Sequence, residues 1–83
     1  MLKNGSRDTK FPENKKINAQ LLPGDREKIA KYSNYTVGTI REMMAGYRRI
    51  TDRAGKAIIK LFEERKAMTE SLNQIANQNN PVQ

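Results

Sequence analysis

Residues that stop or start helices stand at short intervals through the middle of the chain, and they limit every helix before position 51 to a few turns. Pro23 and Gly24 interrupt the chain first, Asn34 tolerates the left-handed conformation that closes a helix, and Gly46 stands where a C-terminal stop is expected. The apolar residues between these stops recur at helical spacing. We therefore expect an all-α chain with a compact domain of three to four helices and a long C-terminal helix.

These helix-ending residues predict three short helices before the long one. The first covers residues 15–22, and the second covers residues 26–33 with Asp25 as its N-cap. Thr36 caps a third helix over residues 37–45. The long final helix begins after Thr51 and has no Gly or Pro between Gly55 and Asn79.

The long helix carries one stripe of residues at alternating spacings of four and three, which is the pattern of a coiled-coil seam. The stripe consists of Ala54, Ile58, Leu61, Arg65, Met68, Leu72 and Ile75. Its first half is expected to complete the core, together with Ile50 and Phe62.

Beyond Phe62 so small a domain has little apolar surface left to cover. Met68, Leu72 and Ile75 are therefore candidates for a homo-oligomer seam, with a dimer favoured. The alternatives are a frayed helix or one that folds back. Arg65 would weaken a long parallel dimer or select a partner with an acidic group opposite it.

This reading divides the chain into four parts. Residues 1–14 form a flexible basic arm, 15–62 the compact domain, 63–79 the helical extension and 80–83 a disordered tail. No apolar run reaches the roughly 18–20 residues that span a bilayer, and the first ten residues lack the apolar centre of a signal peptide. We expect a protein without membrane contact, in the cytoplasm of a bacterial or phage-infected cell.

Composition excludes most catalytic chemistry. The chain has neither Cys nor His, which removes thiolate nucleophiles, the usual zinc ligands and the commonest general base. It also has no Gly-rich phosphate loop or convergent acid and base pair. The protein is therefore not expected to be an enzyme, and no metal, cofactor or small-molecule ligand is predicted.

The charge balance points to a polyanionic partner. Sixteen Lys and Arg stand against nine Asp and Glu, for a net charge of +7 and a pI of about 10.0. The aromatic platforms and signatures of RNA-binding modules are missing, and double-stranded DNA is therefore the favoured partner.

The stretch REKIAKYSNYTVGTIREMMA has the spacing of a helix-turn-helix, in which the second helix enters the DNA major groove. Ile29 and Ala30 would form the inward face of the first helix. Ile40 and Met43 would form that of the second, with Asn34 in the turn.

Through IAKYSNYTVGTIREMMAG and the basic YRR that follows, the chain resembles the lambda-repressor/Cro-like helix-turn-helix family of small bacterial and phage proteins. The resemblance covers roughly residues 21–62. It implies an all-helical DNA-binding domain in transcriptional control, with the second motif helix reading bases. Two departures stand out: Ser33 occupies a position that is usually apolar, and Gly38 one that often carries a long base-reading side chain.

The resemblance also implies two groups of contact residues. The base-reading candidates are Thr36, Val37, Gly38, Arg41 and Glu42. The phosphate candidates are Tyr35, Thr39, Tyr47, Arg48 and Arg49. Glu42 has three interpretations: it accepts a hydrogen bond from a cytosine amino group, it is a solvated charge without a role in binding, or it opposes non-specific binding by repelling phosphate.

These observations predict a sequence-specific double-stranded-DNA-binding protein, a repressor-like transcriptional regulator that acts as a dimer. The alternative is a helical assembly or architectural DNA-binding protein of a phage or mobile element, such as a packaging subunit or a recombination directionality factor.

Overall fold

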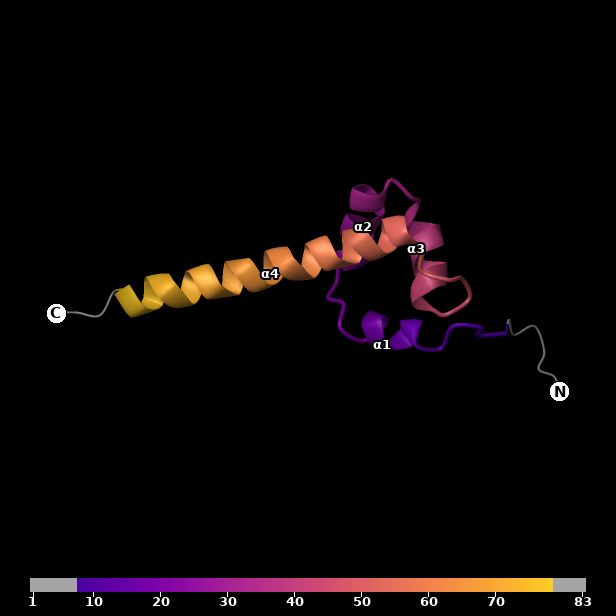
Figure 1. The fold of residues 1–83 in the computed structure, drawn as a ribbon, viewed down its shortest axis with the longest axis horizontal. Helices are drawn as coiled ribbons and strands as arrows, with labels where there is room; N and C mark the ends of the chain where they lie inside the picture. The colour runs from indigo at the N-terminus through magenta and orange to yellow at the C-terminus, as the bar shows by residue number, and fades with distance from the viewer. Residues whose placement is uncertain (1–7, 79–83) are drawn as a thin grey trace.

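Four helices account for 69% of the residues that the computed structural model describes, which are residues 8–78. They are α1 (Asn14–Asn18), α2 (Asp25–Ser33), α3 (Val37–Met44) and α4 (Asp52–Gln78). No strand occurs among these described residues. The prediction of an all-α fold with a long C-terminal helix is confirmed, and Figure 1 shows α4 extending well beyond the other three helices.

The predicted caps around α3 and α4 are confirmed. The Thr36 hydroxyl oxygen accepts a hydrogen bond from the Thr39 amide at 3.2 Å, and that of Thr51 accepts from the Ala54 amide at 3.2 Å. Asn34 closes α2 in the left-handed conformation, with φ of 64°. The sharp turn between α2 and α3 therefore follows from local sequence.

Two details at the start of the domain differ from the prediction. The helix expected over residues 15–22 ends at Asn18, because the amides of Gln20 and Leu21 bond to carbonyls three residues back and tighten the chain into turns. Asp25 is the first residue of α2 rather than its N-cap, a place that Gly24 takes. The Asp25 carboxylate instead accepts the Leu22 amide at 2.7 Å and a guanidinium from α4.

The core lies where α2 and α3 pack beside the first half of α4. The predicted inward residues of the motif are all buried, and so are three of the residues predicted from the first half of α4. The fully or nearly buried apolar residues are Ile29, Ala30, Ile40, Met43, Met44, Ala54, Ala57, Ile58 and Leu61. Ile50 and Phe62 are half-buried against this core. Burial of these side chains supplies the main free energy that holds the three helices together.

Ser33 explains how the motif tolerates a polar residue at a core position. Its side chain is almost completely buried, and its hydroxyl donates to the Ile29 carbonyl at 2.6 Å. The hydroxyl group is thus satisfied within α2, and no polar partner is needed from α3 or α4.

Residues near the N-terminus are fixed to the end of α3. The Phe11 amide donates to the Gly46 carbonyl at 2.9 Å, and the buried Asn14 amide group donates to the carbonyls of Met43 and Arg48, both at 2.9 Å. The C-terminal end of the predicted flexible arm is therefore packed onto the domain. Residues 1–7 and the predicted tail over 80–83 lie outside the described residues.

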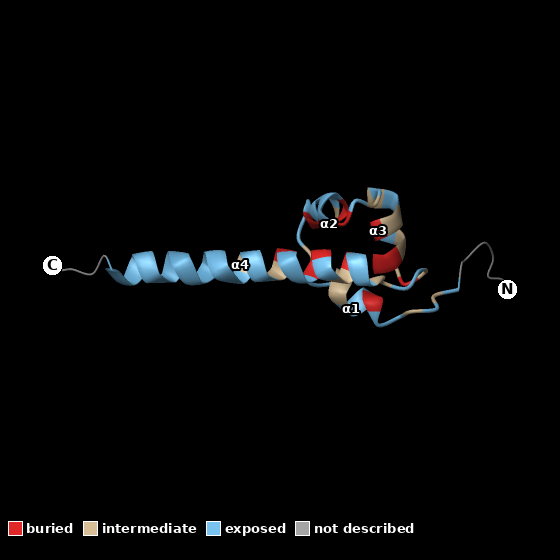
Figure 2. Cartoon of the chain, turned by 45° about the horizontal axis from the view of Figure 1, so that its top comes forward, coloured by how far each residue is buried: buried red, intermediate tan, exposed pale blue. Residues whose placement is uncertain are grey.

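Beyond the core, α4 projects from the domain as a single helix. Burial along α4 ends after Leu61, apart from the partly covered Phe62 and Arg65, and residues 66–78 are exposed (Figure 2). The molecule is elongated as a result, with extents of 67 × 28 × 17 Å. Across residues 8–78, no helix has both the length and the apolar character that crossing a membrane requires.

Candidate nucleic-acid interface

The exposed face of α3 brings together most of the predicted base-reading residues. Ile40, Met43 and Met44 face the core, whereas Gly38 and Arg41 lie three residues apart on the opposite side. Thr36 and Glu42 lie at the edges of this side and keep at least partial exposure, whereas Val37 packs against the core and is only partly exposed. The structure therefore presents Thr36, Arg41 and Glu42 to solvent together, and Val37 only in part.

The beginning of α3 is small and polar. The Thr36 hydroxyl donates to the Thr39 hydroxyl at 3.0 Å while it caps the helix, which leaves the Thr39 proton available to an external acceptor. A Cβ atom added at Gly38 would meet only the Thr36 hydroxyl oxygen, at 3.9 Å. Gly38 therefore leaves open space on the exposed side of α3.

Arg41, one of the base-reading candidates, is paired with a residue of α2. Its Nη2 atom lies 3.5 Å from an oxygen of Glu27, and both side chains are about 60% exposed. Glu27 was not among the predicted site residues. No local sequence pattern indicates this contact, because it depends on how α2 and α3 cross.

A second ion pair joins Glu42 to the phosphate candidate Arg48. The Arg48 Nε atom donates to Glu42 Oε1 at 2.8 Å, and the Glu42 side chain is the less exposed of the two. The chain after α3 therefore returns toward that helix, and it brings Arg48 beside the helix that the sequence assigned to base reading.

Tyr35 and Arg53 form an adjoining contact that includes an additional cation. The Tyr35 hydroxyl lies 2.9 Å from that of Thr51, and the Arg53 guanidinium stacks over the Tyr35 ring at 4.0 Å from its centroid. Tyr35 therefore positions the turn and a basic side chain at the start of α4. Arg53 was not among the predicted site residues, although it follows the predicted phosphate candidates Arg48 and Arg49 by only a few positions.

Arg49 is exposed beside Arg48, and Tyr47 is half-buried, with its amide bonded to the Glu42 carbonyl at 3.0 Å. All five phosphate candidates thus border α3 or lie within it. Over the whole sequence, positive charge is concentrated before position 63. Residues 1–62 contain fourteen basic and six acidic residues, whereas residues 63–83 contain two basic and three acidic residues.

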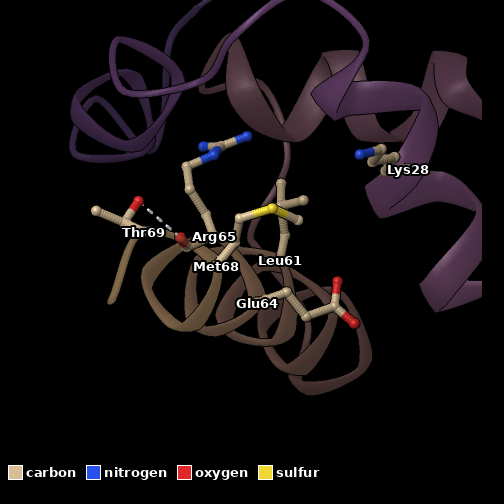
Figure 3. A pocket seen from close by; sticks show the side chains of 6 residues that line it. All are labelled: Lys28, Leu61, Glu64, Arg65, Met68 and Thr69. Atoms are coloured by element: carbon tan, nitrogen blue, oxygen red, sulfur yellow. Dashed lines mark hydrogen bonds between the residues drawn. The ribbon is translucent and has the colours of Figure 1, made fainter. Parts of the chain in front are cut away.

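The seam candidates are remote from this face. Met68, Leu72 and Ile75 are 63%, 57% and 55% exposed and continue the stripe of α4 past the domain. Arg65 is not a member of the exposed stripe, because it reaches away from α4 to Asp25. Arg65 and Met68 line a shallow pocket of about 280 Å³. Figure 3 shows their side chains together with the four other residues that line it.

Comparisons of the chain with protein-family models, with curated proteins and with solved structures find no match. The family resemblance rests on the sequence motif alone.

Proposed function

We propose that this protein binds double-stranded DNA in a sequence-specific manner and acts in the cytoplasm as a repressor-like transcriptional regulator. The observation that carries the proposal is the exposed face of α3, which is small at its beginning and bordered by arginines at its end. A helix of this kind fits the major groove, where base edges present distinct patterns of donors and acceptors.

Each group of residues has a role in this proposal. Arg41 donates two hydrogen bonds to the O6 and N7 atoms of a guanine, and Val37 contacts a thymine methyl group. The Thr39 hydroxyl and the exposed Arg48 and Arg49 bind phosphates, which sets the position of α3 without reading sequence. Arg53, held over the Tyr35 ring, adds a further phosphate contact.

The exposed stripe of α4 supports a dimer. Met68, Leu72 and Ile75 expose large apolar side chains on one face, and a second copy would remove them from water. Two reading helices would then contact half-sites about 34 Å apart on one side of the DNA, and repression would follow from occlusion of the promoter. In this arrangement Leu72→Asp dissociates the dimer in sedimentation, whereas Asn73→Asp, on the side of the helix away from the stripe, leaves it intact.

Selection of bound duplexes from a random pool at about 150 mM salt tests the proposal, because such salt suppresses non-specific electrostatic binding. We expect a palindromic motif. Arg41→Ala should weaken binding mainly to that motif, and the double variant Arg48→Ala/Arg49→Ala should weaken binding to all duplexes and flatten the salt dependence. Failure of the wild-type protein to enrich any sequence would contradict sequence-specific regulation.

The same exposed stripe favours a second candidate, an assembly or architectural DNA-binding protein. Such a protein would form a higher oligomer through α4 and bind DNA with little sequence preference. Mass measurement of the complex with DNA separates the two functions. Two copies on a palindrome support the regulator, and a larger ring or filament on arbitrary sequence supports the assembly protein.

A further inference from the structure

Two arginines of the proposed DNA-binding face are paired with carboxylates on that same face. Arg41 Nη2 lies 3.5 Å from Glu27 Oε2, and Arg48 Nε lies 2.8 Å from Glu42 Oε1. In both pairs at least a third of each side chain is exposed, so that DNA can reach all four groups. A DNA-binding face that holds acidic groups beside its own arginines loses part of its attraction for phosphate.

We propose that Glu27 is a selectivity residue, which holds Arg41 away from the phosphates of arbitrary DNA and releases it to a matching guanine, and that Glu42 holds Arg48 and weakens its binding to phosphate. The inference rests on the proposed function and gives the two carboxylates a defined part in it. It also favours one of the sequence-based interpretations of Glu42, because pairing with Arg48 supports opposition to non-specific binding over recognition of cytosine.

The physical basis is a competition between two kinds of acceptor. An exposed ion pair changes an equilibrium by up to about fivefold, and a bidentate contact with guanine changes it by about fivefold to a hundredfold. A guanine can therefore displace Glu27 from Arg41. A phosphate also accepts two hydrogen bonds from a guanidinium, but it is an anion, and each carboxylate repels phosphates that lie within the Debye length of about 8 Å at physiological salt. The neutral edge of a guanine meets no such repulsion.

The two pairs act on different parts of the face. Glu27 belongs to the first turn of α2 and restrains a residue on the exposed side of α3, whereas Glu42 belongs to α3 and restrains the segment that follows it. Loss of Glu27 therefore frees the proposed base-reading arginine, and loss of Glu42 frees a proposed phosphate-binding arginine. Both losses strengthen binding to arbitrary DNA.

The test compares Glu27→Gln and Glu42→Gln with Glu63→Gln, an exposed position on α4 that changes the net charge by the same amount. The probes are the duplex recovered by selection and a scrambled duplex of the same composition, each of about two helical turns, at about 150 mM salt. We expect the Glu27 and Glu42 variants to bind the scrambled duplex about threefold to tenfold more tightly. For Glu27→Gln, binding to the selected duplex should change less, and the ratio of the two affinities should therefore fall. Glu42→Gln, which frees a phosphate-binding arginine, should strengthen binding to both duplexes by a similar factor. Glu63→Gln should preserve the ratio and have a smaller effect on both affinities.

Two results would overturn the inference and leave the proposed function in place. In the first, the Glu27 and Glu42 variants shift both affinities by the same factor as Glu63→Gln, so that only net charge matters. In the second, Glu42→Gln weakens binding to the selected duplex alone, which is the behaviour of a residue that reads cytosine. A wild-type protein that binds both duplexes equally would overturn the proposed function itself. Circular dichroism of each variant verifies that the helical fold is retained.

Discussion

Arg65 donates from Nη2 to both carboxylate oxygens of Asp25, at 2.7 and 2.8 Å, across forty positions of sequence. Asp25 is almost completely buried and the Arg65 side chain is 31% exposed. The pair fixes the first residue of α2 to the point where α4 leaves the domain. Arg65 was expected to weaken a parallel dimer or to face an acidic group on a partner molecule. The acidic group that it faces is Asp25 of the same chain.

Replacement of Arg65 should destabilise the domain. Arg65→Ala leaves the buried Asp25 carboxylate without its guanidinium partner, and we expect the free energy of unfolding to fall by about 2–3 kcal/mol. Urea denaturation followed by circular dichroism measures this loss. The adjacent exposed residue provides the control, since Lys66→Ala should change stability by less than about 0.5 kcal/mol. Equal stability of the two variants would show that the pair contributes nothing.

Stability should also fall at acidic pH through Asp25. Burial raises the pKa of the Asp25 carboxyl, but hydrogen bonds from Arg65 and the Leu22 amide, with the charges of Arg65 and Lys28, outweigh burial and leave the pKa below its usual value. Because the folded chain holds this proton less tightly than the unfolded chain, the stabilisation is complete above about pH 4 and is lost as the pH falls through the folded pKa. Melting temperatures between pH 7 and pH 2 should therefore fall less steeply for Asp25→Asn than for the wild type. Parallel curves would exclude this origin.

The side chain of Asn14 should be necessary for attachment of the N-terminal segment. Asn14→Asp keeps the shape of the side chain but replaces a donor to two carbonyls with a carboxylate oxygen that repels them. We expect a loss of about 2 kcal/mol or more, and of about 1–2 kcal/mol for Asn14→Ala. Asn73→Asp, on the exposed part of α4, should be nearly neutral in the same urea titration. A neutral Asn14→Asp variant would show that this segment does not depend on the two hydrogen bonds.

Two glycine-to-alanine variants should have opposite effects on stability. A Cβ atom at Gly46 would lie 2.6 Å from the Thr9 methyl carbon and 2.9 Å from the Phe11 carbonyl oxygen, at a residue with φ of +90°. Gly46→Ala should therefore destabilise by about 2 kcal/mol or more. Gly38→Ala meets open space and should stabilise α3 by about 0.5 kcal/mol. Under the proposed function it also weakens DNA binding severalfold, because the methyl group occupies space at the reading face. Thermal melts and DNA titrations measure the two effects separately.

Local rules were sufficient to predict the helix boundaries near the turn. The hydroxyl caps at Thr36 and Thr51 and the left-handed residue Asn34 depend on neighbours within a few positions, and the structure has them as expected. The inward faces of α2, α3 and the first half of α4 follow from helical periodicity in the same way.

Contacts between distant segments could not be predicted from a single sequence. Asp25 has the residue type and position of an N-cap, yet the approach of Arg65 from α4 gives its carboxylate a different set of donors. Asn14 resembles a residue of a polar terminus and is buried only because the end of α3 exposes carbonyls to it. The pairing of Arg41 with Glu27 likewise depends on the crossing of two helices.

The continuity of α4 relates the orientation of the apolar stripe to that of α3. An α-helix turns by about 100° and advances about 1.5 Å per residue, and no break separates Leu61 in the core from Met68 on the projecting part. One residue inserted between them would rotate Met68, Leu72 and Ile75 by more than a quarter turn relative to the face of α3, without altering any side chain of either surface. The number of residues in this segment therefore sets an angle, and a deletion or insertion there would change the geometry of any complex formed through the stripe.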